Sequence, residues 1–322
     1  MEFLKLKNKK ILITGGTGLV GNSFSKYENC ILLSSSECNL LDYFNVVETI
    51  QKYKPDIIIH LAAKVGGILG NTNNNLEYFH TNLTINKNIL KAANECNIEY
   101  VVSMLSTCIY PIDKYPYKET ELHNGEPHPS NYGYAFAKRM LEVDTRLYRQ
   151  TFNRKYICVV PNNIFGENDN FDLQNGHVIP SVIRKVYESK LKNEQLILWG
   201  DGSPLREFTY SHDISKSIFK VLENVIENKI TEENSLVNIG NSNEISIKDV
   251  SEKVCKNFEY EKQITWDITK PLGVFRKPSD NTKFKNMFST NEEYKTWYTN
   301  FDYALELTCR WFKETYPNIR GL

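Results

Sequence analysis

The sequence predicts an α/β protein with a doubly wound parallel sheet and a smaller C-terminal α/β lobe. Three observations support this prediction. In the first half of the chain, short apolar segments alternate with longer segments of helical periodicity. A glycine-rich segment follows the first apolar segment directly. After Gly166 the alternation ends, and Asn, Asp and Gly accumulate over residues 167–176, which indicates a boundary between two parts of the structure.

The first half is expected to alternate buried strands with helices. The strands are expected at residues 10–14, 30–33, 56–61, 100–105 and 156–160. The helices are expected at residues 18–27, 42–53, 76–97 and 132–152. Because parallel strands are joined by right-handed crossovers, helices should cover both faces of the sheet. A ligand should therefore bind beyond the carboxyl ends of the strands.

The second half is expected to form the smaller lobe. A helix should follow His177, residues 199–204 read as a tight turn, and further helices are expected at residues 214–228, 246–258 and 301–316. Residues 207–240 should fold back and extend the first sheet. The expected division is a dinucleotide-binding domain (residues 1–166 plus about 207–240) and a substrate-binding lobe (residues 167–206 plus about 241–322).

The composition excludes some classes of partner. Among 322 residues, 39 Lys and Arg balance 39 Asp and Glu, so no global basic field favours nucleic acid or an anionic membrane. The seven cysteines are scattered without metal-ligand spacing, so no metal is expected and a reducing, cytoplasmic setting is predicted. The charged N-terminal segment lacks the apolar stretch of a signal peptide.

The glycine-rich segment predicts a dinucleotide-binding loop. It has the spacing GGxGxxG between a strand and a helix, where glycines allow a tight turn and close approach of the backbone to a pyrophosphate. After the second strand the chain reads Ser34, Ser35 and Ser36, with no acid until Glu37. Because serine hydroxyls can donate to a 2′-phosphate and a carboxylate would repel it, NADP(H) is the predicted cofactor. The loop residues assigned to the cofactor are Gly15, Thr17, Gly18, Leu19, Val20 and Gly21.

Tyr134 and Lys138 form a candidate catalytic pair. They lie four residues apart on an expected helix, so both side chains share one face. A neighbouring ammonium group should lower the pKa of the phenol toward neutrality. The phenol could then donate a proton to a carbonyl oxygen as hydride arrives at the carbon. Ser106, at the end of the fourth strand, could bond the same oxygen.

With these motifs, the chain resembles the extended short-chain dehydrogenase/reductases, which have a Rossmann fold, and among them the GDP-L-fucose synthase family. The resemblance implies NADPH-dependent 3,5-epimerisation and 4-keto reduction of GDP-4-keto-6-deoxy-D-mannose, in a homodimer paired through its long helices. The matching segments are residues 11–21, 60–68, 105–111, 122–140, 161–171, 175–180 and 199–208.

The resemblance also implies roles for individual residues. Ser106, Tyr134 and Lys138 would be the reductase triad. Cys108 and His177 would be the acid/base pair of the epimerisation; a thiol and an imidazole can both exchange protons near neutral pH. Further cofactor contacts would come from Thr17, Ser35, Ser36, Ala63, Lys138, Asn163, Ile164 and His177. Nucleotide-sugar contacts would come from Lys185, Trp199 and Arg206.

One segment departs from the family pattern. Leu272 in the segment Lys270-Pro271-Leu272-Gly273 replaces the family's acid, which leaves the exact sugar open. A 4-reductase or epimerase acting on another GDP-linked keto-sugar is therefore an alternative. A non-catalytic dinucleotide sensor is a further alternative, against which the intact Tyr134/Lys138 pair argues. A 4,6-dehydratase is disfavoured, because such relatives carry an Asp-Glu pair where this chain has Cys108-Ile109.

Overall fold

The computed structural model describes residues 3–231, 235–270 and 274–322. Its centre is a six-stranded parallel sheet with strand order β2-β1-β3-β4-β5-β9. The strands are short, apolar and mostly buried on both faces, as expected for a parallel sheet covered by helices. Their bounds are β1 Ile11–Thr14, β2 Cys30–Leu33, β3 Ile57–His60, β4 Tyr100–Met104, β5 Lys155–Pro161 and β9 Leu236–Ile239.

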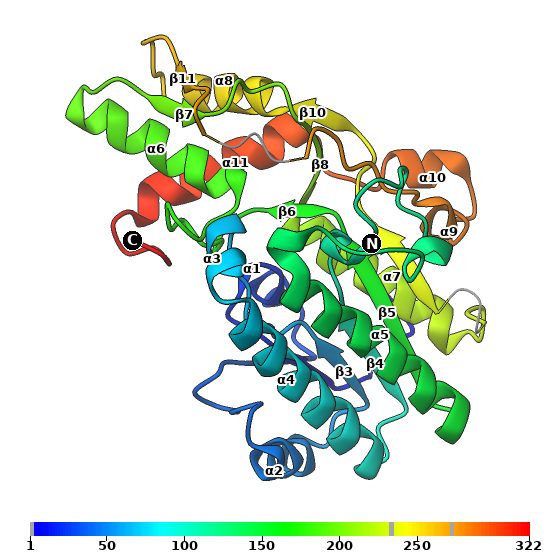
Figure 1. The fold of residues 1–322 in the computed structure, drawn as a ribbon. Coiled ribbons are helices and arrows are strands. Elements are labelled where there is room, and N and C mark those ends of the chain that lie inside the picture. Colours follow the sequence, from blue (N-terminus) through cyan, green and yellow to red (C-terminus); the bar gives the residue numbers. More distant parts are fainter. Residues whose placement is uncertain (1–2, 232–234, 271–273) are drawn as a thin grey trace.

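Two apolar layers cover this sheet because successive strand side chains point to opposite faces. On one face, Leu12 and Ile58 pack with residues of α2, α4 and α5. On the other, Ile13 and Ile59 pack with residues of α1 and α7. Figure 1 shows α4 and α5 side by side along the first face. The helices are α1 Leu19–Asn22, α2 Tyr43–Tyr53, α3 Ile68–Asn73, α4 Asn75–Glu95, α5 Tyr132–Phe152 and α7 Ser211–Ile226.

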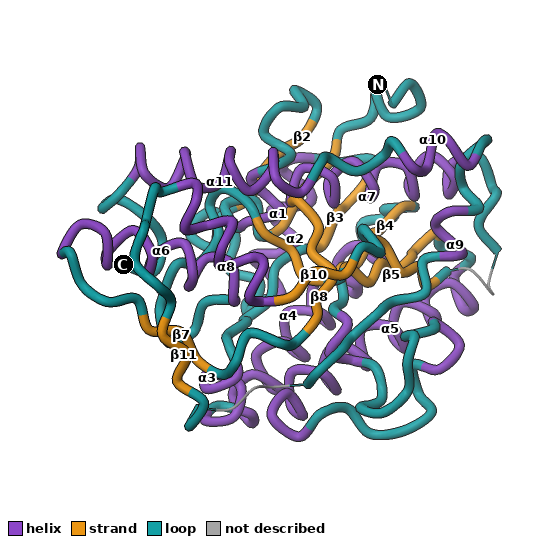
Figure 2. Tube along the Cα trace, turned by 90° about the horizontal axis from the view of Figure 1, so that it is seen from above, coloured by secondary structure: helices purple, strands orange, loops and turns teal. Residues whose placement is uncertain are grey.

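A second part of the structure lies beyond the carboxyl ends of the central strands (Figures 1 and 2). It contains a three-stranded sheet of order β10-β8-β6 and a two-stranded sheet of β11 and β7, around a separate apolar core. Its strands are β6 Asn163–Phe165, β7 Ile197–Trp199, β8 Leu205–Tyr210, β10 Glu244–Ser246 and β11 Thr265–Asp267. The later helices are α6 Val178–Lys192, α8 Ile247–Asn257, α9 Thr282–Lys285, α10 Asn291–Lys295 and α11 Phe301–Thr315.

One sequence prediction about this architecture needs correction, and another is confirmed for part of its range. The helix expected at 18–27 is only Leu19–Asn22; the Ser23 hydroxyl donates to the carbonyls of Val20 and Ser211, a local alternative to helical bonding. Residues 207–240 do fold back and extend the central sheet through β9, whereas β8 in the same range pairs with β6 and β10. The proposed domain limits remain a prediction.

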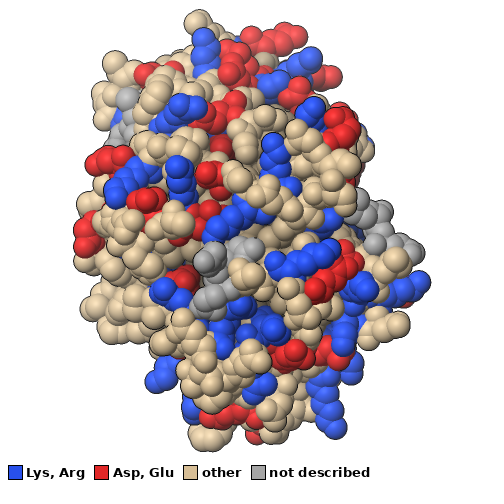
Figure 3. All heavy atoms as spheres, turned by 90° about the vertical axis from the view of Figure 1, so that its right-hand side faces the viewer, with Lys and Arg blue, Asp and Glu red and all other residues tan. Residues whose placement is uncertain are grey.

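The charge distribution matches the balanced composition. On the face shown in Figure 3, basic and acidic side chains are interspersed across the surface. The described residues include no helix with the length and apolarity to cross a membrane, and no group of potential metal ligands occurs among them.

Candidate active site

A large cavity lies at the carboxyl edge of the central sheet, between this sheet and the second part of the structure. Its volume is about 1030 Å³, and both parts of the structure contribute to its wall. Every residue predicted from the sequence to contact cofactor or substrate lines this cavity, with the exception of Ser36. Segments far apart in the sequence therefore meet at one site.

The glycine-rich loop forms one end of the cavity. Gly15 has φ +72°, and a Cβ there would lie 2.9 Å from the Ala62 nitrogen, so both its conformation and its surroundings require glycine. A Cβ on Gly21 would collide with the backbone of Gly15 and Gly16. The loop is held to the neighbouring strand by a bond from the Gly16 amide to the Leu33 carbonyl at 2.8 Å. This loop has the close packing that a dinucleotide cradle requires.

The segment after β2 brings only some of its serines to the cavity. Ser34 and Ser35 line the cavity, and Ser36 does not. The Ser36 hydroxyl lies 2.9 Å from the Ser34 hydroxyl, which in turn donates to the Glu37 carboxylate at 2.6 Å. Hydrogen bonds from Ser34 lower the pKa of Glu37. Ser36 therefore takes part in a local turn network and does not line the cavity, and its assignment as a cofactor contact stays a prediction.

Tyr134 and Lys138 lie on α5 and both line the cavity. The Lys138 ammonium donates to the Met104 carbonyl at 2.7 Å, and burial lowers its pKa to about 8. Burial also raises the pKa of Tyr134 above its usual value, with a smaller contribution from Cys108. The prediction that Lys138 draws the pKa of Tyr134 toward neutrality is therefore wrong. Desolvation sets the direction of the shift, and it favours the protonated phenol.

Ser106 and Cys108 lie just beyond β4. Ser106 precedes a short 3-10 helix, Thr107–Ile109, which contains Cys108. Burial raises the pKa of the Cys108 thiol, while a hydrogen bond from Ser106 and the charges of Lys277 and Lys138 oppose that rise. The cationic surroundings thus favour the thiolate that burial disfavours.

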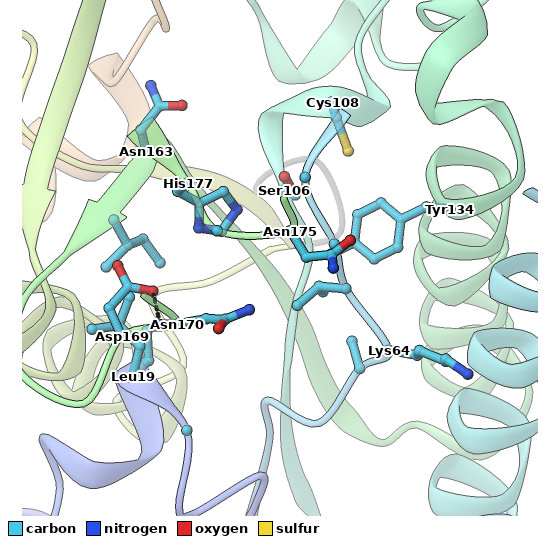
Figure 4. A pocket seen from close by; sticks show the side chains of 18 of the residues that line it. Leu19, Lys64, Ser106, Cys108, Tyr134, Asn163, Asp169, Asn170, Asn175 and His177 are labelled. Atoms are coloured by element: carbon cyan, nitrogen blue, oxygen red, sulfur yellow. Dashed lines mark hydrogen bonds between the residues drawn. The ribbon is translucent and has the colours of Figure 1, made fainter. Parts of the chain in front are cut away.

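His177 enters the cavity from the second part of the structure. It is the residue before α6, and its carbonyl accepts the first bond of that helix from Ser181 at 3.1 Å. In Figure 4, His177 and Tyr134 point toward Ser106 from opposite sides, and the Cys108 sulfur points toward the same region. Asn163 lies on the His177 side and donates to the Glu207 carbonyl at 2.8 Å. Two proton-exchanging groups and two hydroxyls therefore face a common space.

The predicted sugar-nucleotide contacts lie in the second part of the structure. The Lys185 ammonium lies 5.2 Å from the centre of the Trp199 ring. This ring remains about half exposed, at 47%. Arg206 donates to the Leu205 carbonyl at 2.7 Å, and burial lowers the pKa of both Arg206 and Lys185. These partly desolvated cations suit an anionic ligand.

Asp169 and Arg320 at the site were missed by sequence reasoning, and Lys277 could not be placed from the sequence. Asp169 lines the cavity and is 4% exposed, and burial raises its pKa to about 6. Lys277 lines the cavity as well, and burial followed by the charge of Arg206 lowers its pKa. Arg320 reaches the cavity from the C-terminal segment, where its carbonyl accepts from Phe171 at 2.9 Å. The acid in the Asn/Asp/Gly-rich segment was a usable signal for Asp169, but nothing local identifies Arg320.

Two residues near the expected sugar site had not been placed from the sequence. Leu272, on which the substrate alternative rests, lies outside the described residues. Arg276 binds Glu244 in an exposed ion pair, so this guanidinium is engaged away from the cavity.

Comparison with known proteins agrees with this geometry. Residues 11–240 match the NAD dependent epimerase/dehydratase family. A GDP-L-fucose synthase of Dictyostelium discoideum is 38% identical, with 97% of this chain and 98% of the relative covered. The GDP-L-fucose synthase of Escherichia coli (strain K12) is 29% identical over 98% of this chain and 100% of the relative.

A solved structure shows the same architecture. The crystal structure of a GDP-L-fucose synthetase from Naegleria fowleri bound to NADP superimposes with a TM-score of 0.86 at 33% identity. The alignment covers 98% of this chain and 95% of that one. The family match spans most of the chain and includes the glycine loop and the Tyr134/Lys138 pair. The chain belongs to the NAD dependent epimerase/dehydratase family.

Proposed function

We propose that this protein converts GDP-4-keto-6-deoxy-D-mannose to GDP-L-fucose by 3,5-epimerisation and NADPH-dependent 4-keto reduction. The observation that carries the proposal is the single cavity that holds Ser106, Cys108, Tyr134 and His177 beside a glycine-rich loop. The similarity to GDP-L-fucose synthases over nearly the whole chain supports it. The acid/base groups of an epimerisation and the proton donor of a reduction would thus share one site.

The residues present fit a dinucleotide. The glycine loop leaves no room for a Cβ at Gly15 or Gly21, which is the packing expected where backbone approaches a pyrophosphate. The loop, Ser35, Ala63, Asn163 and Ile164 would hold the cofactor. When bound, NADPH supplies hydride to the keto carbon.

For the epimerisation, Cys108 and His177 would exchange the protons at C3 and C5. The keto group at C4 acidifies these protons, so inversion needs one group to remove a proton and another to return it from the other side. The two side chains reach the cavity from different elements, the segment after β4 and the residue before α6. The hydroxyls of Ser106 and Tyr134 would donate to the keto oxygen and stabilise the enolate.

For the reduction, Tyr134 would give its proton to the same oxygen. Burial raises the pKa of this phenol, so it is protonated at neutral pH, which is the state that a proton donor needs. The Lys138 ammonium on the same helix would stabilise the phenolate that remains. Removing the keto group ends the acidity at C3 and C5, so epimerisation must precede reduction.

The diphosphate end would be held by cations from the second part of the structure. Lys185, Arg206 and Lys277 all line the cavity. A guanidinium can bind phosphate oxygens in a bidentate manner, and an ammonium binds them as a point charge. Trp199 would cover the nucleotide or sugar with its exposed face.

The proposal includes a homodimer and a reducing, cytoplasmic setting. All seven cysteines are free, which supports the reducing setting.

Helices α4 and α5 pack together and leave large apolar side chains exposed, which supports pairing with a second copy. Light scattering after size-exclusion chromatography tests this, with twice the mass of one chain expected. The exposed apolar residues on the two helices are Leu76, Tyr132, Met140, Leu147 and Phe152.

The test is turnover of GDP-4-keto-6-deoxy-D-mannose with NADPH in D2O. We expect NADPH oxidation and deuterium at both C3 and C5 of the product. Cys108→Ala should abolish the incorporation, whereas Cys96→Ala, at a half-buried cysteine outside the cavity, should behave as wild type. Absence of both NADPH oxidation and deuterium would refute the proposal. Reduction without deuterium would instead support a simple 4-reductase, the alternative that Leu272 suggests.

A further inference from the structure

A chain of buried hydrogen bonds connects the glycine loop with helix α5. Its central member is His60, the last residue of β3, which is 0% exposed. In the sheet, His60 lies opposite Thr14 of β1 on one side and opposite Ser103 of β4 on the other. Thr14 immediately precedes Gly15 of the glycine loop. The imidazole therefore lies at the edge of the sheet where the dinucleotide loop begins.

The hydrogen bonds of His60 define one tautomer. Burial lowers the pKa of His60 to about 3, so the ring is neutral at physiological pH. Its Nε2 lies 3.0 Å from Asn86 Oδ1, while the Asn86 Nδ2 donates to the Ala137 carbonyl at 3.3 Å. Because an amide oxygen can only accept, Nε2 of His60 carries the hydrogen and Nδ1 is an acceptor. The Thr14 hydroxyl, 2.8 Å from Nδ1, is then the donor.

At one end, this chain of bonds holds the dinucleotide loop. The Thr14 hydroxyl oxygen accepts from the Ala62 amide at 3.4 Å. Ala62 is also the residue against which Gly15 packs so closely that a Cβ would not fit. Thr14, Gly15 and Ala62 all line the cavity. A shift of the His60 ring would therefore move the backbone of the dinucleotide cradle.

At the other end, the chain of bonds holds the catalytic helix. Asn86 lies on α4 and is 2% exposed, and the Ala137 carbonyl that it binds directly precedes Lys138. The charge of Lys138 acts on the His60 ring, so the two side chains lie near each other. The backbone that carries Lys138 is thus anchored through Asn86 to His60.

We propose that His60 is a positioning residue of the reductase site, whose two hydrogen bonds fix the spacing between the dinucleotide loop and the helix that carries Tyr134 and Lys138. The inference rests on the proposed function. Hydride transfer needs the nicotinamide, the keto carbon and the proton donor in one geometry, and a displacement of about 1 Å can lower the rate about a hundredfold. His60 does not line the cavity, so it acts through Thr14 and Asn86.

The test compares His60→Leu with wild type in D2O, at saturating NADPH and GDP-4-keto-6-deoxy-D-mannose. NADPH oxidation in a single turnover should fall by about tenfold or more, because the nicotinamide and Tyr134 lose their fixed spacing. Deuterium entry at C3 and C5 should fall by about threefold or less, because Cys108 and His177 belong to segments outside this chain of bonds. A merely structural role would reduce the folded fraction and lower both rates equally, and that outcome would overturn the inference.

Two near-isosteric variants test the same point should His60→Leu fail to fold. Thr14→Val removes the bond on the loop side, and Asn86→Leu removes those on the helix side. If His60 transmits position between the two ends, their effects on the single-turnover rate are not additive, and the double variant is as slow as the slower single one. The control is Tyr156→Phe, which removes a buried bond to the Ile98 carbonyl outside the cavity. It should lower the unfolding temperature and leave both rates unchanged.

Failure of this inference is distinguishable from failure of the proposed function. Wild-type protein that does not oxidise NADPH with the keto-sugar would refute both. An active wild type whose single-turnover rate is unchanged in Thr14→Val and Asn86→Leu, or falls additively in the double variant, would overturn the role of His60 alone.

Discussion

Asp169 offers a quantitative test of the electrostatics of the cavity. It is 4% exposed, and the Asn170 amide donates to its Oδ1 at 2.7 Å. Its Oδ2 is buried without a hydrogen-bond partner among the described residues. Burial raises its pKa from 3.8 to about 6, although the charges of His177 and Arg320 oppose the rise. The ionised carboxylate is therefore costly in the folded protein.

The sign of the pH dependence follows from this shift. Because the folded-state pKa is the higher one, the stabilising contribution of Asp169 is fully present below pH 3.8 and is lost as the pH rises through about 6. The shift of about two pKa units costs about 3 kcal/mol at pH 7 and about 1 kcal/mol at pH 4.5. Asp169→Asn removes the ionisation and keeps an oxygen for the Asn170 amide.

We expect Asp169→Asn to unfold at a higher temperature than wild type, by about 4 °C at pH 7 and by about 1–2 °C at pH 4.5 for a chain of this length. Differential scanning calorimetry at the two pH values measures this. Asp172→Asn is a matched control, and it should unfold at a lower temperature than wild type at pH 7. Amide hydrogen bonds from Asn175 and Gln174 lower the pKa of Asp172, so its ionised form stabilises the folded protein. An Asp169→Asn variant that is destabilised at pH 7, or equally stabilised at both pH values, would refute the reasoning.

Three further predictions concern the loop, the buried lysine and the exposed ring. Gly21→Ala should cost about 1–3 kcal/mol of stability and weaken NADPH binding in titrations, since its methyl group meets the Gly15 backbone. Burial lowers the pKa of Lys138 to about 8, so the rate of NADPH oxidation should fall above about pH 8. A rate that stays unchanged up to pH 10 would contradict this. Trp199→Ala should raise the sugar KM about tenfold and leave kcat unchanged, through loss of the Lys185 contact.

Much of the fold could be predicted because its signals are local. Each central strand is a short apolar segment, and the glycine loop is recognisable from its spacing between strand and helix. The membership of β8 in a separate sheet could not be predicted, because it depends on pairing with β6 and β10, which lie far away in the sequence. Strand existence is encoded locally, whereas sheet partners are not.

The same distinction holds at the site. Tyr134 and Lys138 were recognisable because they share a helix face. The direction in which the pKa of Tyr134 shifts, however, depends on burial by distant segments. Ser36 was assigned from its position in sequence, and the structure places its hydroxyl against Ser34. Arg320 approaches the cavity only because the C-terminal segment packs against the chain near Phe171.

The central claim is that one cavity carries two separable reactions, in which Cys108 and His177 move the protons of the epimerisation and Tyr134 supplies the proton of the reduction. The most direct measurement is deuterium incorporation and NADPH oxidation by Tyr134→Phe with GDP-4-keto-6-deoxy-D-mannose in D2O. We expect deuterium still to enter C3 and C5, more slowly than in wild type, because Cys108 and His177 remain and the Ser106 hydroxyl still donates to the keto oxygen, while NADPH oxidation falls by roughly a hundredfold or more. NADPH oxidation at the wild-type rate, or complete loss of deuterium incorporation in a folded variant, would contradict the account.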